Sequence, residues 1–373
     1  MSPIYLDYNA TTPLDERVLE AMMPYLTNRF GNAASRTHFY GWEAAQAIDL
    51  AREQVADLIG ATAKEIVFTS GATESNNLAI KGLYYNLSLS KNHILTLKTE
   101  HKAILDACAS LEKTGVQIAF LPIDKHGIVA PNALVLAIKP NTFLVSVMYA
   151  NNETGVIQDI EKIGEICREN NVVFHTDATQ AVGKLGIDVT TQNIDLLSLS
   201  AHKFYGPKGV GALFVKKGLK INAQLNGGSQ ERGMRAGTLN VPSIVGMGKA
   251  AQIAKSEMFA ESQRLEKLRN HLENTLLGFG NIKANGLTYN RLAHVCNLTF
   301  EGQDGELLMM KLKDLAVSNG SACTSALVEP SHVLKALGLS DAQAHASIRF
   351  SLGRYTTPKD IETTIEMIKA VLL

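Results

Sequence analysis

Short apolar runs alternate with amphipathic stretches through the first two thirds of the chain. The runs are rich in Ile, Leu, Val and Phe and are bounded by polar residues, as expected of buried strands. They cover residues 65–69, 94–97, 143–148, 172–175 and 196–199. Residues 42–59 have apolar side chains near helical spacing and end before Gly60, and residues 160–168 are a second helical stretch. This alternation predicts an α/β domain around a mostly parallel sheet.

The pattern changes after about residue 258. Residues 262–277, 305–314 and 358–372 predict helices, and residues 294–299 predict a strand. We therefore expect a smaller α+β domain. We assign residues 14–258 to the large domain, and residues 1–13 and 259–373 to the small one.

Composition narrows the class of protein without identifying it. The chain has 373 residues, 46% hydrophobic and 19% charged, which is ordinary for a globular protein. Lys plus Arg and Asp plus Glu number 36 each, so the net charge gives no support for binding nucleic acid or an anionic membrane. The first residues lack a signal-peptide pattern, and no apolar run reaches the roughly 20 residues of a membrane helix. We expect a cytoplasmic protein without direct nucleic-acid or membrane partners.

Reactive or phosphate-binding groups follow all five predicted strands of the large domain. In open α/β sheets, ligands bind beyond the carboxyl ends of the strands. The groups lie in residues 70–73, 98–101, 149–152, 176–180 and 201–203. We expect these five segments to converge on one pocket.

Two of these segments favour a phosphorylated, cationic ligand. A loop containing Gly71 precedes a helix that begins near Thr73, and a helix start favours phosphate; the alternative is that Thr73 is a simple N-cap. Asp177 follows an apolar strand, so its carboxylate needs a cation such as a protonated pyridine nitrogen. The alternative for Asp177 is a structural cap on the next helix.

Lys203 and His101 are candidates for chemistry on such a ligand. A desolvated lysine at the mouth of an apolar strand can lose its proton and form a Schiff base; the alternative is an ordinary surface lysine. The Schiff-base role is favoured by the neighbouring Ser200, His202 and Gly-rich turn at residues 206–209. His101 could stack on a cofactor and exchange a proton, although a lone histidine is more often structural.

The four cysteines are scattered and form no CxxC pair, so neither a disulfide framework nor a metal site is expected. Cys323 lies in the small, polar, Gly-containing residues 318–326, which predict an exposed loop and a usable thiol. Cys108, Cys167 and Cys296 lie among apolar or helical residues and are expected to pack. Arg349, in a strand-like stretch, suits a carboxylate ligand, with an ordinary salt bridge as its alternative.

Nine segments together carry a family resemblance. They are YLDYNATTP from Tyr5, FTSGATESNNLAIKG from Phe68, TEHKAIL from Thr99, NNETGVIQDI from Asn151, HTDATQAVGK from His175, SAHKFYGPKGVGAL from Ser200, RGMRAGTLN from Arg232, SNGSACTSA from Ser318 and SIRFSLGR from Ser347. Nearly end to end, the chain resembles the cysteine desulfurases of iron–sulfur-cluster assembly. These are class V aminotransferase-like pyridoxal-phosphate enzymes.

The resemblance implies the fold type I, aspartate-aminotransferase-like fold of pyridoxal-phosphate-dependent transferases, with a large mostly parallel-sheet domain and a small α+β domain. It implies that Lys203 holds the cofactor pyridoxal 5'-phosphate as a Schiff base. Asp177 would pair with the pyridine nitrogen and Gln180 with the phenolic oxygen. His101 would stack on the ring and act as an acid–base.

The resemblance also implies the remaining contacts. The cofactor phosphate would be held by Ala72, Thr73, Ser200 and His202, and by Thr238 of a neighbouring subunit in a homodimer. Asn152 and Arg349 would hold the carboxylate of L-cysteine. Cys323 would receive the sulfur as a persulfide while L-alanine leaves, and it can transiently ligate an iron–sulfur cluster; no other metal is expected.

The recipient of the sulfur stays open. A sulfur-acceptor or iron–sulfur scaffold protein is expected, for cluster assembly or for tRNA thiolation. Housekeeping members of the family continue beyond the position of Leu373 with a segment that helps to dock the scaffold, so a more specialised acceptor is an alternative. The rival functions are a selenocysteine lyase or transaminase on the same fold, and a non-catalytic sulfur-relay protein. Intact Lys203, Asp177 and His101 argue against the last.

Overall fold

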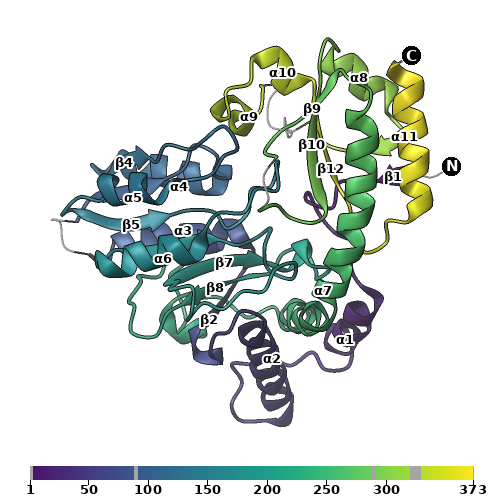
Figure 1. Cartoon of the computed structure of the whole chain (residues 1–373). Helices are drawn as coiled ribbons and strands as arrows, with labels where there is room; N and C mark the ends of the chain where they lie inside the picture. Colours follow the sequence, from purple (N-terminus) through teal and green to yellow (C-terminus); the bar gives the residue numbers. More distant parts are fainter. Residues whose placement is uncertain (1–2, 88–90, 288–289, 320–328, 373) are drawn as a thin grey trace.

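A seven-stranded sheet forms the centre of the larger part of the molecule (Figure 1). The computed structural model describes residues 3–87, 91–287, 290–319 and 329–372. The strand order is β2-β8-β7-β6-β5-β3-β4, and every strand is parallel to the others except β8, which is antiparallel to β2 and β7. The strands are β2 (Ile66–Thr69), β3 (His93–Thr96), β4 (Gln117–Phe120), β5 (Thr142–Ser146), β6 (Val173–Asp177), β7 (Leu196–Ser200) and β8 (Gly211–Val215). The predicted mostly parallel sheet is confirmed.

Helices cover both faces of this sheet, which explains why its inner strands are buried along almost their whole length. Neighbouring residues on a strand point to opposite faces, so Leu144 joins the core under α3 and α4 whereas Val145 joins the core under α2, α5, α6 and α7. These helices are α2 (Phe39–Leu58), α3 (Ala72–Tyr84), α4 (Lys102–Glu112), α5 (Pro131–Ala137), α6 (Ile160–Glu169) and α7 (Val241–Leu277). Strand β4 was not predicted because it lies at the sheet edge and its side chains are partly exposed.

The smaller part has its own sheet and its own apolar core. Its antiparallel sheet has the order β12-β10-β9, from β12 (Ser347–Ser351), β10 (Val295–Phe300) and β9 (Ile282–Ala284). Beside it, β1 (Ile4–Tyr5) pairs in parallel with β11 (Leu315–Ala316), so the chain's beginning lies in this part. The helices are α8 (Gly305–Lys311), α9 (His332–Ala336), α10 (Asp341–His345) and α11 (Pro358–Leu372).

Helix α7 runs unbroken for 37 residues and packs on both cores. The prediction that this helix begins at residue 262 is wrong, because it begins at Val241 after the Asn240 cap. Gly246 and Gly248 weaken the helical pattern, yet a Cβ there would lie 2.5 Å from Met22 Sδ and from Ala51 Cα respectively. The glycines therefore allow α7 to approach α1 (Glu16–Leu26) and α2 closely.

The two cores suggest a division within α7, whose Met258 belongs to the large core and whose Leu265 belongs to the small one. We propose residues 14–258 as the large domain and residues 1–13 with 259–373 as the small domain. Across the described residues, no helix combines the length and apolar character that a membrane crossing needs.

Candidate active site

A cavity of about 910 Å³ opens where the carboxyl ends of the parallel strands meet the small sheet. The structure brings ten of the twelve predicted site residues to its wall. They are Ala72, Thr73, His101, Asn152, Asp177, Gln180, Ser200, His202, Lys203 and Arg349. Segments from all five predicted strand ends therefore meet in one place, together with Arg349 from β12.

Two predicted site residues are not placed there. Thr238 is exposed and does not line the cavity. Cys323 lies outside the described residues, although Ser318 and Asn319, which precede it, line the cavity wall. Cavity residues that the sequence analysis did not identify include Asn9 and Asn76.

One end of the cavity is formed by the start of α3. Gly71 caps this 13-residue helix without a side-chain hydrogen bond, so the first backbone N–H groups and the positive end of the helix are presented to a ligand. The loop is crowded from behind, because a Cβ on Gly211 would lie 2.6 Å from the Gly71 Cα. Burial, with Lys203 adding to it, lowers the pKa of the nearby His202 to about 4, so this imidazole is neutral. This end of the cavity therefore suits a phosphate group.

Asp177 is the last residue of β6 and is buried at the cavity floor. Its Oδ2 accepts a hydrogen bond of 2.7 Å from Asn76 Nδ2, and its Oδ1 accepts one of 3.0 Å from the Thr179 backbone N–H. The carboxylate thus caps the following turn, as its structural alternative expected, and still faces the cavity.

Unpaired buried polar atoms surround the same space. Within the described part of the chain, four cavity residues each have such an atom: Asn76 Oδ1, Asn152 Oδ1, Thr179 Oγ1 and Arg349 Nε. Buried polar atoms in native proteins are nearly always hydrogen-bonded. Their concentration here fits a cavity that receives a polar ligand, and the chemistry of the wall fits a phosphorylated, cationic ring such as pyridoxal phosphate.

Lys203 lies three residues after β7, in the short 3-10 turn Ala201–Lys203, rather than at the strand end itself. Its Nζ donates to the backbone oxygens of Asn9 and Ala10 at 2.6 and 2.7 Å. Burial lowers the pKa of the amine to about 8, and the Arg349 charge acts in the same direction. The amine therefore becomes a nucleophile at mildly alkaline pH, unlike an ordinary surface lysine.

His101 caps α4, where its Nδ1 accepts a hydrogen bond of 3.1 Å from the Ala103 backbone N–H. The proton of the neutral ring is therefore on Nε2. The residue is exposed and lines the cavity, and desolvation by the surrounding protein lowers its pKa, so the ring is neutral near pH 7. A neutral ring with one free N–H is suited to stacking and to proton exchange.

Arg349 crosses from the small sheet to the cavity. Its guanidinium pairs with Asp7 at 2.5 Å and donates to the Asn152 backbone oxygen at 2.9 Å. The ordinary salt bridge that was its alternative is thus present, while the unpaired Nε remains for another group. A guanidinium beside an Asn amide is a suitable carboxylate site.

Lys184 is a site neighbour that the sequence analysis missed. Its Nζ donates to Gln180 Oε1 at 3.2 Å, and Gln180 Nε2 donates to the Asn9 backbone oxygen at 3.0 Å. Burial, followed by the Lys203 charge, lowers the pKa of Lys184 to about 7. Its sequence signals are its spacing, four residues after Gln180, and its place at the end of the family segment that starts at His175.

The three described cysteines do not take part in this site. Cys108, Cys167 and Cys296 are free thiols buried in the apolar cores. Burial raises the pKa of Cys108 and of Cys296 to about 12, so these thiols stay protonated and unreactive. Their predicted packing role is confirmed.

Comparison with known proteins covers nearly the whole chain. The family model described as aminotransferase class V matches residues 4–364. A cysteine desulfurase IscS from Photorhabdus laumondii is 55% identical over 370 residues, which are 98% of this chain and 92% of the relative. The Escherichia coli protein of the same name is 54% identical over 371 residues, with the same coverage.

Solved structures agree with the sequence comparison. A NifS-like protein superposes with a TM-score of 0.93 at 36% identity, over 99% of both chains. A structure described as SspA in complex with cysteine superposes with a TM-score of 0.84 at 40% identity, over 95% of this chain and 100% of the other. The family resemblance and the fold are confirmed.

The environment of Lys203 predicts its reactivity in the cofactor-free protein. Below pH 8 the amine is mostly protonated and inert, and above pH 8 it is mostly neutral, because its pKa is lowered to about 8 from 10.5. Competitive labelling with acetic anhydride from pH 6 to 11, read by peptide mass spectrometry, should give Lys203 a midpoint near 8. Titration of Lys203 together with the bulk of the lysines, near 10.4, contradicts the buried, neutral amine.

Proposed function

The chain belongs to the class V aminotransferase family, among its cysteine desulfurases, and we propose that it converts L-cysteine to L-alanine and passes the sulfur on as a persulfide. The observation that carries the proposal is Lys203, a buried amine with a lowered pKa at the cavity floor. It stands beside a buried carboxylate, Asp177, and opposite a helix start.

The cofactor we propose is pyridoxal 5'-phosphate, which when bound withdraws electrons from the substrate carbon atoms. Lys203 would hold it covalently, Asp177 would face its pyridine nitrogen, Gln180 would face its phenolic oxygen, and the His101 ring would stack on it. The phosphate would be bound by the start of α3 and its neighbours Ala72, Thr73, Ser200 and His202, with Thr238 from the second subunit.

Asn152 and Arg349 would bind the substrate. Both line the cavity, and each has an unpaired buried atom, Oδ1 and Nε respectively. A guanidinium and an amide together match the two oxygens of an amino-acid carboxylate. The solved relative named above is described in complex with cysteine, which agrees with L-cysteine as the substrate.

Two groups of lowered pKa would move the protons. Lys203, once released from the cofactor, has an amine of lowered pKa that can take a proton from the substrate carbon. His101 has its protonated Nε2 free, because its Nδ1 is occupied by the Ala103 N–H. Both groups line the cavity, and desolvation by the surrounding protein lowers both pKa values.

Cys323 would take the sulfur. Its thiolate forms a bond to the substrate sulfur as the carbon–sulfur bond breaks, and the carbon atom then takes a proton, so that L-alanine leaves and a persulfide remains. The proposed recipient is a sulfur-acceptor or iron–sulfur scaffold protein, for cluster assembly or tRNA thiolation, with Cys323 as a transient cluster ligand. A reducing cytoplasm would preserve such a thiol.

We propose a homodimer, because large apolar side chains gather at the start of α2 and the turn before it. Phe30, Phe39 and Trp42 are 71%, 65% and 57% exposed, and Phe30 stacks on Tyr40 with 5.4 Å between ring centroids. An aromatic group of this size on the surface is typical of an interface. A second copy would cover it and bring the exposed Thr238 to the neighbouring site.

The activity is tested with Cys323→Ser. Alanine and sulfide production from L-cysteine with a thiol acceptor should fall about 100-fold or more, because the nucleophile is lost. Cys108→Ser is the matched control, since that buried thiol lies away from the cavity. Full activity of the Cys323 variant excludes Cys323 as the nucleophile, and a wild type that makes no alanine from L-cysteine excludes the proposed function.

The cofactor is tested by absorbance. The wild type reconstituted with pyridoxal phosphate should show a band near the visible edge that Lys203→Ala lacks, and sodium borohydride should fix the cofactor to Lys203 only in the wild type. Lys216→Ala, which changes an exposed lysine paired with Asp195, should keep the band. A colourless wild type, after reconstitution, contradicts the proposal.

The homodimer is tested by light scattering after size-exclusion chromatography. The double variant Phe30→Ser and Phe39→Ser should shift the mass from two chains toward one, because it removes the apolar contact. Leu136→Ser removes another exposed apolar side chain, on α5, and should leave the mass unchanged. A wild type with the mass of one chain rejects the homodimer.

A further inference from the structure

The N-terminal residues 9–12 form hydrogen bonds with Lys203 and with the turn that carries it. Two of their backbone oxygens, from Asn9 and Ala10, accept hydrogen bonds from its amine. Thr12 contacts the backbone on both sides of the lysine: its Oγ1 donates to the His202 oxygen at 3.1 Å and accepts from the Tyr205 N–H at 2.8 Å. One buried hydroxyl thus spans the turn that carries the amine.

Tyr205 makes this turn unusual. Its φ of 67° lies in the left-handed region, which is unfavourable for a residue with a Cβ and persists only where the surroundings enforce it. Two hydrogen bonds hold the Tyr205 backbone in this conformation. Its N–H donates to Thr12 Oγ1, and its oxygen accepts from the Asp15 N–H at 3.1 Å. The strained conformation begins two residues after Lys203, where it sets the direction of the turn.

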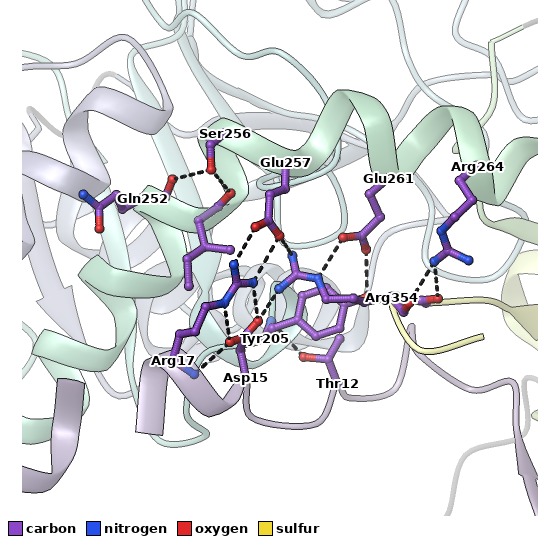
Figure 2. Close-up of polar contacts among 12 residues, drawn as sticks. Thr12, Asp15, Arg17, Tyr205, Gln252, Ser256, Glu257, Glu261, Arg264 and Arg354 are labelled. Atoms are coloured by element: carbon purple, nitrogen blue, oxygen red, sulfur yellow. Dashed lines mark hydrogen bonds and ion pairs between the residues drawn. The ribbon is translucent and has the colours of Figure 1, made fainter. Parts of the chain in front are cut away.

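The side chain of Tyr205 is also held in place by hydrogen bonds. The hydroxyl donates to Glu261 Oε1 at 2.9 Å and accepts from the Arg354 N–H at 2.6 Å. The Arg354 guanidinium lies 4.2 Å from the centre of the ring. Figure 2 shows Tyr205 between Thr12 and this guanidinium, with the carboxylates of Asp15 and Glu261 beside it.

The network extends to three separate parts of the chain. Asp15 belongs to the cap of α1, Glu261 to α7, and Arg354 to the turn before α11. Arg17 joins the same group through Asp15 and Glu257 (Figure 2). None of these charged residues lines the cavity. Glu261, Arg354 and Asp15 contact the lysine turn through Tyr205.

We propose that Thr12 is a positioning residue for Lys203: its hydroxyl bridges His202 and Tyr205, and so holds the amine in the buried position from which it reaches the cavity. The inference rests on the proposed function for its meaning in catalysis. Its physical content, the placement of the amine, is independent of which reaction follows. Without the bridge, the turn relaxes from the strained conformation and the amine moves toward water.

The test uses Thr12→Val, which keeps the shape of the side chain and removes both hydrogen bonds of the hydroxyl. The Thr12 backbone N–H still donates to the His202 oxygen, at 3.0 Å. Thr12→Ser restores the hydroxyl. The matched control is Thr364→Val, because Thr364 is equally buried and its hydroxyl donates to the Asp360 oxygen at 2.7 Å within α11, away from the cavity. Each variant is measured by acetic anhydride labelling without cofactor, by kcat and KM with cofactor, and by thermal unfolding.

In Thr12→Val, the labelling midpoint of Lys203 should rise from about 8 toward 10.5, since the amine regains water. We expect kcat to fall about 10- to 100-fold with KM nearly unchanged, as for a misplaced reacting group. Thr12→Ser should restore both values. Thr364→Val should lower the unfolding temperature and leave labelling and kcat as in the wild type.

An unchanged labelling profile of Lys203 in Thr12→Val overturns the inference, and so does an equal change in Thr364→Val. If Thr12→Val does not fold, Thr12→Ala takes its place, because it also removes both hydrogen bonds of the hydroxyl and should shift the labelling in the same direction; an unchanged profile there is equally decisive. A shifted profile in a protein whose wild type does not desulfurate cysteine rejects the proposed function alone.

Discussion

The placement of the Lys203 amine is the constraint around which the candidate site is arranged. Two backbone oxygens accept hydrogen bonds from it, which favours the charged form, whereas burial and the Arg349 guanidinium favour the neutral form. The net effect lowers the pKa of the amine from that of an ordinary lysine to about 8. The hydrogen bonds therefore fix the direction of the amine, and its surroundings make it more reactive. Asp177 and Arg349, of opposite charge, lie on the same wall, so small shifts of either one change this balance.

The direction of each strand explains which residues meet this amine. Parallel strands present their carboxyl ends at one edge, and this places Asp177 of β6 near the turn after β7. Strand β8 is antiparallel, so its beginning lies at that edge instead. Its preceding residues Lys208 and Gly209 thus line the cavity, and Gly211 allows the β2–α3 loop to come close. A fully parallel sheet would need another crossover to bring a glycine to the same place.

The part of the site that was predictable is the part with a local signal. The change from an apolar run to polar residues identified the strand ends that carry His101, Asn152 and Asp177, and the family motifs then assigned their roles. Asn9 and Thr12 were missed because they precede every strand of the large sheet, and their hydrogen bonds to Gln180 and Tyr205 span 171 and 193 residues. The start of α7 was missed for another reason: its glycines, which weaken a helical pattern, are required by close packing on α1 and α2. In both cases the determining partner is distant in sequence.

The hydrogen bonds of the first residues also impose an order on folding. Asn9 and Asp7 bind Ser351 and Arg349, across 342 residues of chain. On the ribosome, these N-terminal residues emerge first, and Asp7 and the Asn9 N–H must wait for nearly the whole polypeptide before they find these partners. The large parallel sheet can form earlier, together with the contacts of Asn9 and Thr12 to Gln180 and Tyr205. The cavity is therefore completed last, and a chain interrupted before β12 is synthesised would have a folded sheet without a competent site.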